Sequence, residues 1–321
     1  MKHLFIIDPI EKLVVEKDST LMWAHTLKDQ GEEVFVSFDK DWSFSNDQDS
    51  DTAPSFQFES VLNSETFYVE KFEIKESLEV SLDEQTIIYF RKDPPFDKHY
   101  LHLAWILRHI ERKVGLIINS PEGVLQWNEK LIAYDRDEGV IETFIGQNED
   151  QALEWLKNLK GDVQSLIIKP LDLYQGIGVE KIDLSEFNEG TLKEKFSAIQ
   201  KQYEGHFVLQ PYLKSVEEGE IRSVFSVGKH IGSIIKVPPK GEFLANIARG
   251  ASYSKIELSK PLMKECEKAA KDLREYGVEL VAFDILDNKI SEINITCPGL
   301  LVELSSAHEK NLCLDIIETL K

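Results

Sequence analysis

One short segment, residues 283–295, restricts the fold more than any other part of this 321-residue chain. Its pattern is that of two β-strands joined by a polar turn over residues 287–289. Alternation places Glu292 and Asn294 on one face of the second strand, and a three-residue turn places Asp284 directly opposite Glu292. Like charges facing each other across a strand pair are destabilising, so the arrangement calls for a cation. Two carboxylates and an amide oxygen suit Mg²⁺ better than zinc; the alternative is a solvent-facing hairpin with scattered acids.

The charge balance limits the partners of this chain. It has 57 acidic and 37 basic residues and a formal net charge of −20 at pH 7. Such a balance argues against a general nucleic-acid surface or an anionic membrane surface, because both require a basic face. No segment approaches the ~18 consecutive apolar residues of a membrane span. The three cysteines, Cys266, Cys297 and Cys313, are too widely spaced for a disulfide framework, so we expect a cytoplasmic protein in which Cys297 is structural.

The N-terminal third has the pattern of a doubly wound α/β domain. An apolar strand over residues 4–7 precedes a helix that ends at Gly31, and a second strand follows at 34–36. Residues 86–90 and 116–119 are further strands, with a helix over 98–113 between them. The polar residues 41–58 predict an excursion loop or a loose hairpin.

Two further regions follow, so the expected fold class is α/β, with an α+β character in the later regions. We expect domains at 1–121, 122–203 and 204–321, with the first boundary at a Ser-Pro-Glu-Gly sequence. The remaining expected elements are strands at 166–169, 207–210 and 221–225 and helices near 149–159, 191–202, 261–276 and 308–320.

Two lysines are candidates for binding phosphate. Lys169 ends an apolar strand and precedes a loop that contains Gly176 and Gly178, and glycines let backbone amides approach a phosphate closely. Lys130 lies just after the first domain boundary. The spacing of a P-loop is absent. A solvated lysine at a strand end and a surface lysine on a helix remain the alternatives.

Two more positions have chemical interest. The segment containing Gln210 and Tyr212 leaves a buried strand through a proline, and it could offer backbone groups to an adenine; an ordinary strand exit is the alternative. Arg222 alternates with apolar residues on a strand, and its guanidinium suits a transferring phosphoryl group. The alternative for Arg222 is a cross-strand partner for one of the many acids.

In order along the chain, these features resemble the ATP-grasp ligases and, within them, the bacterial glutathione synthetases. The resemblance covers most of the chain. It is carried by the runs Lys17-Asp18-Ser19, Arg91-Lys92-Asp93-Pro94-Pro95-Phe96-Asp97, Asn128-Glu129-Lys130-Leu131, Lys169-Pro170-Leu171-Asp172 and Thr296-Cys297-Pro298, together with Asp284, Glu292 and Asn294.

The resemblance implies an N-terminal pre-ATP-grasp domain followed by a two-lobed ATP-grasp fold. It also implies ATP and Mg²⁺, with Mn²⁺ as the alternative ion, as cofactors. The resemblance also implies roles for individual residues. Those implied for nucleotide binding are Lys130, Lys169, Gln210, Tyr212, Gly176 and Gly178, and those implied for metal binding are Asp284, Glu292 and Asn294. Arg222 and Arg249 are implied for catalysis, and the residues implied for substrate binding are Asp18, Ser19, Arg91, Asp93 and Asn246.

Two loops depart from the family pattern. Leu173 and Gln175 replace glycines of the family's lid, and a leucine cannot adopt φ > 0 cheaply. In a second loop the family's flanking arginines fall at Leu244 and Ser252, although Arg249 could supply one charge from a shifted position. These changes concern the acceptor end of the reaction.

By resemblance, we expect a carboxylate–amine ligase that acts through an acyl phosphate on small molecules, with γ-glutamylcysteine and glycine as substrates, and a homo-oligomer, as is typical of the family. A ligase for another dipeptide or amino-acid pair is one alternative. A non-catalytic nucleotide-binding homologue is the other, and the altered loops motivate it.

Overall fold

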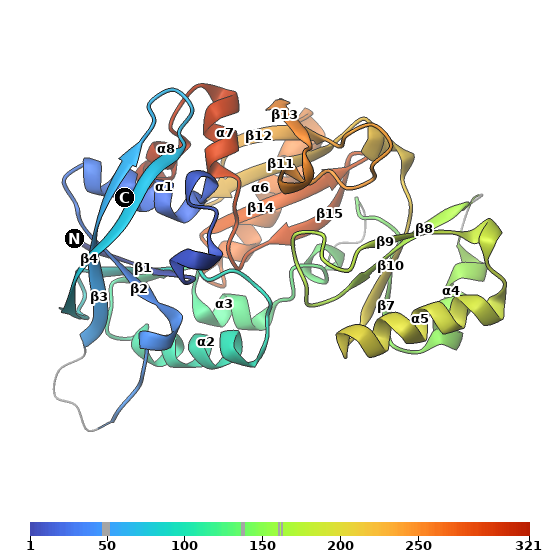
Figure 1. The fold of residues 1–321 in the computed structure, drawn as a ribbon, viewed down its shortest axis with the longest axis horizontal. Coiled ribbons are helices and arrows are strands. Elements are labelled where there is room, and N and C mark those ends of the chain that lie inside the picture. The colour runs from blue at the N-terminus through green and yellow to red at the C-terminus, as the bar shows by residue number, and fades with distance from the viewer. Residues whose placement is uncertain (47–51, 136–138, 160, 162) are drawn as a thin grey trace.

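The computed structural model describes residues 1–46, 52–135, 139–159, 161 and 163–321. Strands in these residues form three sheets, and Figure 1 shows the C-terminal sheet between the other two. The expected mixed α/β class is confirmed. In the described ranges, no helix is long and apolar enough to cross a membrane.

The N-terminal sheet has the strand order β4-β3-β2-β1-β5-β6. Its strands are β1 (Lys2–Ile7), β2 (Glu33–Phe38), β3 (Thr52–Leu62), β4 (Val69–Ser81), β5 (Thr86–Phe90) and β6 (Leu116–Ile118). The pairs among β1, β2, β5 and β6 are parallel, whereas β3 and β4 add an antiparallel hairpin at one edge.

Residues 41–58 were expected to form an excursion loop or a loose hairpin; residues 52–58 instead belong to a long strand of a regular hairpin. Strand β3 alternates between buried and exposed residues, with polar side chains among both sets, so its apolar periodicity in the sequence is weak. Residues 47–51 of the expected loop lie outside the described residues.

Helices cover both faces of the N-terminal sheet, as a doubly wound fold requires. Helix α1 (Ser19–Asp29) packs with Phe5 and Ile7 of β1, whereas α2 (Lys98–Ile110) packs with the alternate residues Leu4 and Ile6. An aspartate caps each helix, since Asp18 and Asp97 accept hydrogen bonds from the first backbone N–H groups.

The smallest sheet has the order β7-β10-β8-β9 and is antiparallel. Its strands are β7 (Phe144–Gly146), β8 (Ser165–Pro170), β9 (Glu180–Asp183) and β10 (Phe207–Pro211), and its helices are α4 (Glu149–Asn158) and α5 (Glu189–Tyr203). Both helices pack on the same face of the sheet (Figure 1). The sequence put β10 in the third region, but its pairing with β8 extends this sheet to Pro211.

The C-terminal sheet is antiparallel, with the order β13-β12-β11-β14-β15. Its strands are β11 (Glu220–Ser226), β12 (Lys229–Val237), β13 (Ser252–Lys255), β14 (Leu280–Leu286) and β15 (Lys289–Asn294). Helix α6 (Lys260–Arg274) packs on one face, and α7 (Leu301–His308) and α8 (Leu312–Leu320) pack on the other.

Helix α8 confirms the helix expected near 308–320, and α7 is an additional helix before it. The chain turns at Glu309, whose φ of 52° ends α7. The same two helices share a core with α1 of the N-terminal domain.

Helix α3 (Pro121–Gln126) begins the connection between the domains. The described 3-10 helices are Ile10–Lys12, Val15–Lys17, Asp39–Asp41, Ile132–Tyr134, Leu184–Glu186, Lys214–Glu217 and Ile247–Arg249.

The β14–β15 hairpin has the expected pairing of Asp284 with Glu292, but its turn differs from the expected one. Its turn consists of Asp287 and Asn288 alone, with φ of 54° and 57°. This two-residue turn would shift the register, but an extra residue, Ser291, bulges from β15 and restores the pairing of Asp284 with Glu292. The expected three-residue turn was therefore wrong, whereas the pairing that it predicted is present.

One buried side chain fastens the N-terminal domain to the C-terminal sheet. Asn119 donates hydrogen bonds of 2.7 Å to the carbonyl oxygens of Leu280 and Ile295. Its own oxygen accepts from the backbone N–H groups of Glu279 and Leu280. The contact fixes the end of β6 against the start of β14 and the end of β15.

Candidate active site

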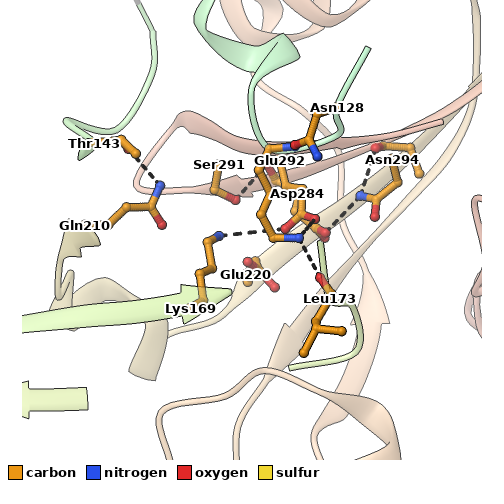
Figure 2. Close-up of polar contacts among 12 residues, drawn as sticks. Asn128, Thr143, Lys169, Leu173, Gln210, Glu220, Asp284, Ser291, Glu292 and Asn294 are labelled. Carbon is orange, nitrogen blue, oxygen red and sulfur yellow. Dashed lines mark hydrogen bonds and ion pairs between the residues drawn. The ribbon is translucent and has the colours of Figure 1, made fainter. Parts of the chain in front are cut away.

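The acidic residues of the hairpin converge as the sequence predicted. Asp284 and Glu292 face each other across β14 and β15. Asn294 donates from Nδ2 to Asp284 Oδ2 at 3.1 Å, which leaves its amide oxygen for another partner. Figure 2 shows these three side chains gathered on one patch.

Two lysines approach Glu292 from different parts of the chain. Lys130 Nζ lies 3.4 Å from Glu292 Oε1. Lys169 Nζ, on β8 of the smallest sheet, lies 3.8 Å from Glu292 Oε2 (Figure 2). Burial by itself would raise the pKa of Glu292, but the two positive charges hold this pKa below its usual value. The structure thus brings both predicted lysines to the hairpin.

Arg222 is the direct cross-strand neighbour of Asp284 on β11. Its Nε and Nη2 atoms donate to the two oxygens of Asp284 at 2.9 and 2.8 Å. Burial would raise the pKa of Asp284, but Arg222 and a second cation outweigh it and lower this pKa strongly. The pairing is the cross-strand alternative that the sequence left open for Arg222.

That second cation is Lys236 on β12, which the sequence analysis missed. Lys236 Nζ lies 3.1 Å from Asp284 Oδ1 and 2.7 Å from Glu220 Oε2. Only 5% of Lys236 is exposed. A single lysine within the apolar run Ile234-Ile235-Lys236-Val237 was the signal that could have identified it.

The acids do not need a metal ion for charge compensation, because side-chain cations supply it. Within the described residues, no group of three or more His, Cys, Asp or Glu side chains could hold a metal ion. Asp284, Glu292 and Asn294 offer two carboxylates and an amide oxygen, an incomplete oxygen shell. Mg²⁺ commonly binds in this way, through one or two carboxylates plus phosphate and water, so the donor chemistry fits that ion.

Glu129 is a second residue that the sequence analysis did not assign. Its Oε1 atom accepts hydrogen bonds from the N–H groups of Ile295 and Thr296 and from the hydroxyl of Thr296, at 2.7 to 2.8 Å. These bonds hold the segment that carries Lys130 against the residues that follow Asn294. Glu129 therefore fixes the position of Lys130 relative to the hairpin.

The predicted adenine hinge contains side chains that are already paired. Gln210 Nε2 donates to the hydroxyl of Tyr134 at 3.1 Å and to that of Thr143 at 3.0 Å; Figure 2 shows the contact with Thr143. The backbone N–H of Tyr212 donates to the carbonyl of Ser165. Lys181 Nζ lies 3.6 Å from the centroid of the Tyr212 ring, so a cation–π contact fixes this ring at the end of β10.

The two altered loops touch each other. Asn246 Nδ2 donates to the carbonyl of Gln175 at 2.8 Å, and Arg249 Nη2 lies 3.5 Å from the carbonyl of Gly176. Arg249 therefore points to the neighbouring loop. Gly176, Gly178 and also Gln175 have positive φ, of 74°, 71° and 52°.

Leu173 does not share that conformation, so its replacement of a family glycine costs no such strain. Its carbonyl instead accepts a 2.6 Å hydrogen bond from Lys130 Nζ. The first loop is thereby tied to the phosphate-side lysine at one end and to the second loop at the other.

Four of the five predicted substrate residues lie near the carboxyl ends of β1 and β5, whereas Asn246 lies apart from them, against Gln175. Asp18, Arg91, Asp93 and Cys297 line one small pocket there. Burial raises the pKa of Asp18 to about 6. Ser19, the next residue along, is buried and accepts a hydrogen bond from the N–H of Leu301.

A wider surface groove of about 380 Å³ lies between α1 and the β3–β4 hairpin. It contains none of the predicted site residues. We therefore assign the chemistry to the smaller, charged clusters.

The three-sheet fold, with its cluster of charged residues reached from several segments, is that of an ATP-grasp ligase, an enzyme that forms amide bonds. Two family models match the chain: the N-terminal domain of prokaryotic glutathione synthetase over residues 1–124 and its ATP-grasp domain over residues 129–309. The chain belongs to the prokaryotic glutathione synthetase family.

Full-length relatives agree with this assignment. The chain is 29% identical to the glutathione synthetase of Prochlorococcus marinus over 320 residues, which cover 100% of this chain and 99% of the relative. It is 26% identical to the glutathione synthetase of Shewanella oneidensis over 318 residues, covering 98% and 97% of the two chains.

Solved structures with the same fold are more distant in sequence. The D-cycloserine synthetase DcsG is 13% identical, covers 100% of both chains and has a TM-score of 0.66. The macrocyclase MdnC of Microcystis aeruginosa, bound to its precursor peptide MdnA, is 11% identical, covers 99% of this chain and 100% of its own, and has a TM-score of 0.63. The ATP-grasp fold implies that the chain binds ATP.

Proposed function

We propose that the chain joins γ-glutamylcysteine to glycine with ATP and Mg²⁺, giving glutathione, ADP and phosphate. The observation that carries the proposal is the charge of the cluster around the hairpin. Its carboxylates are Asp284, Glu292 and Glu220, and its cations are Arg222, Lys236, Lys130 and Lys169. The four cations converge on one small patch from different segments, an arrangement that suits a polyphosphate.

The lysines have the geometry for phosphate groups. Lys130 and Lys169 converge on Glu292 from two different segments, and each is buried or nearly so. An ammonium acts on phosphate as a point charge. We assign the remaining nucleotide contacts to Gly176 and Gly178 of the loop and to the hinge at Gln210 and Tyr212.

Asp284, Glu292 and Asn294 would hold Mg²⁺, with Mn²⁺ as the alternative ion. A bound Mg²⁺ supplies positive charge that neutralises phosphate oxygens during transfer. Arg222 already holds Asp284 with two of its N–H groups, and its other N–H groups can reach the transferring phosphoryl group.

The reaction requires no side-chain nucleophile. The substrate carboxylate takes the γ-phosphoryl group of ATP to become an acyl phosphate, and the amine then displaces the phosphate. The chain's contribution is positioning and electrostatic stabilisation. The contact between Asn246 and Gln175 joins the two loops. We assign these loops the exclusion of water, which would otherwise hydrolyse the acyl phosphate.

We assign the carboxylate substrate to the pocket of Asp18, Arg91 and Asp93, next to Ser19, and the amine side to Asn246 and Arg249. All partners in this proposal are small molecules rather than nucleic acid or membrane, and the enzyme works in the cytoplasm as a homo-oligomer.

Phosphate release tests the proposal. The purified chain is mixed with ATP, Mg²⁺, γ-glutamylcysteine and glycine, and the tripeptide is detected by mass spectrometry. We expect phosphate and glutathione in equal amounts, with neither formed when one substrate is omitted. If turnover occurs only with another dipeptide or amine, γ-glutamylcysteine and glycine are not the substrates, but the chain is still a ligase.

The substituted second loop favours that other outcome, because arginines of the family pattern are absent at Leu244 and Ser252. A panel of amino acids and amines offered with γ-glutamylcysteine examines it. Tight ATP–Mg²⁺ binding with no product from any pair would identify a non-catalytic nucleotide-binding protein instead.

A further inference from the structure

The small pocket of the predicted substrate residues lies at the point where the N-terminal sheet reverses its strand order. Strands β1 and β5 are neighbours, and the helices that follow them pack on opposite faces. Ligands of open α/β sheets bind outside the carboxyl ends of such a strand pair. Asp8 directly follows β1, Arg91 and Asp93 follow β5, and all three line the pocket. The pocket therefore has the position of a ligand site.

The size of the pocket limits what can enter it. Its volume is about 10 Å³, and a single water molecule needs roughly this much space. A whole dipeptide cannot enter. The pocket can therefore hold only one small head group of a substrate whose remaining atoms lie outside, and the side chains that line the pocket decide the charge of that head group.

Two of the lining carboxylates, those of Asp18 and Asp93, form no ion pair with any residue that the structure describes. Asp18 Oδ1 accepts the backbone N–H groups of Thr20 and Leu21 at 2.9 and 2.8 Å. Its Oδ2 atom accepts no hydrogen bond within the described ranges. Asp93 has a hydrogen bond with the thiol of Cys297, which is a weak donor. Both carboxylates thus keep acceptor capacity at the pocket.

The nearby cations of the chain have other partners. Arg91 Nε donates to Thr20 Oγ1 at 3.1 Å, and Arg91 Nη2 donates to the carbonyl of Pro298 at 2.8 Å. Lys92 pairs with two other aspartates instead. Burial raises the pKa of both pocket carboxyl groups, Asp18 and Asp93. A positively charged head group between them would offset this cost of burial.

The pocket is close enough to the phosphate cluster for one substrate to reach both. Cys297 lines the pocket, and the predicted metal ligand Asn294 is three residues earlier in the chain, so their Cα atoms are at most about 11 Å apart. In γ-glutamylcysteine, the α-nitrogen and the carbon of the cysteine carboxylate are separated by seven bonds, which span about 8 Å when extended. The two ends of this dipeptide can therefore be held at the same time.

We propose that the pocket binds the α-ammonium group of the γ-glutamyl end of the substrate, between Asp18 and Asp93, and thereby selects carboxylates with a free ammonium group at their far end. This inference rests on the proposed ligase function and names the part of the substrate that the pocket recognises. The charge of Arg91 suits the α-carboxylate on the same carbon atom. An ammonium group held by two carboxylates keeps its protons, so the attacking amine comes from the second substrate.

A substrate analogue tests this role. Glutarylcysteine has hydrogen in place of the α-ammonium group of γ-glutamylcysteine and keeps both of its carboxylates. For the unmodified chain, we expect kcat/KM to be about 30-fold or more lower with glutarylcysteine, because hydrogen bonds between charged groups are lost. In Asp93→Asn, and in Asp18→Asn, which keeps the cap of α1, this ratio should be at least about five-fold smaller. An unchanged ratio in both variants, or no preference in the unmodified chain, overturns the proposal.

The matched control is Asp97→Asn. Asp97 caps α2 with two hydrogen bonds like those of Asp18, but it is not among the residues that line the pocket. Its ratio should stay within about two-fold of that of the unmodified chain.

Titration calorimetry of the unmodified chain provides a readout that needs neither turnover nor a variant. We expect γ-glutamylcysteine to bind at least about ten-fold more tightly than glutarylcysteine. A chain that forms no glutathione contradicts the proposed substrates, and the pocket is then judged by calorimetry alone. Equal affinity for the two compounds, or binding of neither, overturns the assignment of the pocket.

Discussion

Arg222 and Asp284 lie opposite each other on β11 and β14, and the guanidinium donates to both carboxylate oxygens at 2.9 and 2.8 Å. The arginine therefore has two functions at once. It neutralises a buried carboxylate that faces Glu292, and it holds this carboxylate in one orientation next to the phosphate site. Strand pairing makes the contact rigid, because neither backbone can shift without breaking the sheet.

Replacing Arg222 with lysine keeps the positive charge but removes the planar guanidinium, whose N–H groups bind two oxygens at once. A single ammonium cannot bind both oxygens of Asp284 and still reach a phosphoryl group. For Arg222→Lys we expect kcat to fall about 10²- to 10³-fold, with little change in KM for ATP. Steady-state phosphate release measures both values. Arg274→Lys, an exposed arginine on α6, is the control, and a variant at position 222 that keeps a third of the normal kcat would contradict the role.

The metal assignment predicts a specific change in Mg²⁺ dependence. Glu292→Gln removes one of two carboxylates, so we expect at least about ten times more Mg²⁺ for half-maximal turnover at fixed ATP. Removal of Mg²⁺ with a chelator should stop turnover, and added Mg²⁺ should restore it.

The matched control for this titration is Asp287→Asn. Asp287 is an exposed acid in the turn of the same hairpin, and its φ of 54° is one that asparagine also tolerates. Equal Mg²⁺ requirements for the two variants would show that Glu292 is not a ligand.

Asn119 should be a determinant of stability rather than of turnover. Asn119→Ala removes four hydrogen bonds and leaves buried backbone groups of Glu279, Leu280 and Ile295 unpaired. We expect the free energy of unfolding to fall by about 3–5 kcal/mol. Chemical denaturation measures it, with Asn158→Ala on the exposed face of α4 as the control. A loss below about 1 kcal/mol would show that the hydrogen bonds of Asn119 do not fasten the N-terminal domain to the C-terminal sheet.

Asp18 should make stability depend on pH. Its pKa is raised by burial to about 6 in the folded protein, against ~3.9 in an unfolded chain. The folded state therefore binds more protons between these values, and the free energy of unfolding falls as pH rises from about 4 to about 6. We expect a loss on the order of 1–2 kcal/mol over this range, after allowance for partial solvent screening.

Asp18→Asn removes that titration and keeps the cap of α1, because asparagine is an equally good cap. The difference in unfolding free energy between the unmodified chain and this variant should change with pH over the same range. Asp97→Asn, at the exposed cap of α2, is the matched cap variant to be measured beside it. Parallel pH profiles for Asp18→Asn and the unmodified chain would refute the prediction.

Local patterns predicted much of the fold. Apolar runs identified the parallel strands, and α1 and α2 were predicted between them. The regular edge hairpin β3–β4 was not predicted, because β3 carries polar residues among both its buried and its exposed positions. The assignment of β10 failed for another reason, since a strand's sequence does not say which sheet will pair with it.

That Asp284, Glu292 and Asn294 share a face could be predicted from local sequence, because alternation along a strand is a local property. The groups that surround them depend on the packing of distant segments. Lys130, Lys169 and Lys236 come from segments tens of residues apart, and their approach depends on how three sheets pack. The bulge at Ser291 was also decided there, because the buried face of β15 fixes its register against β14.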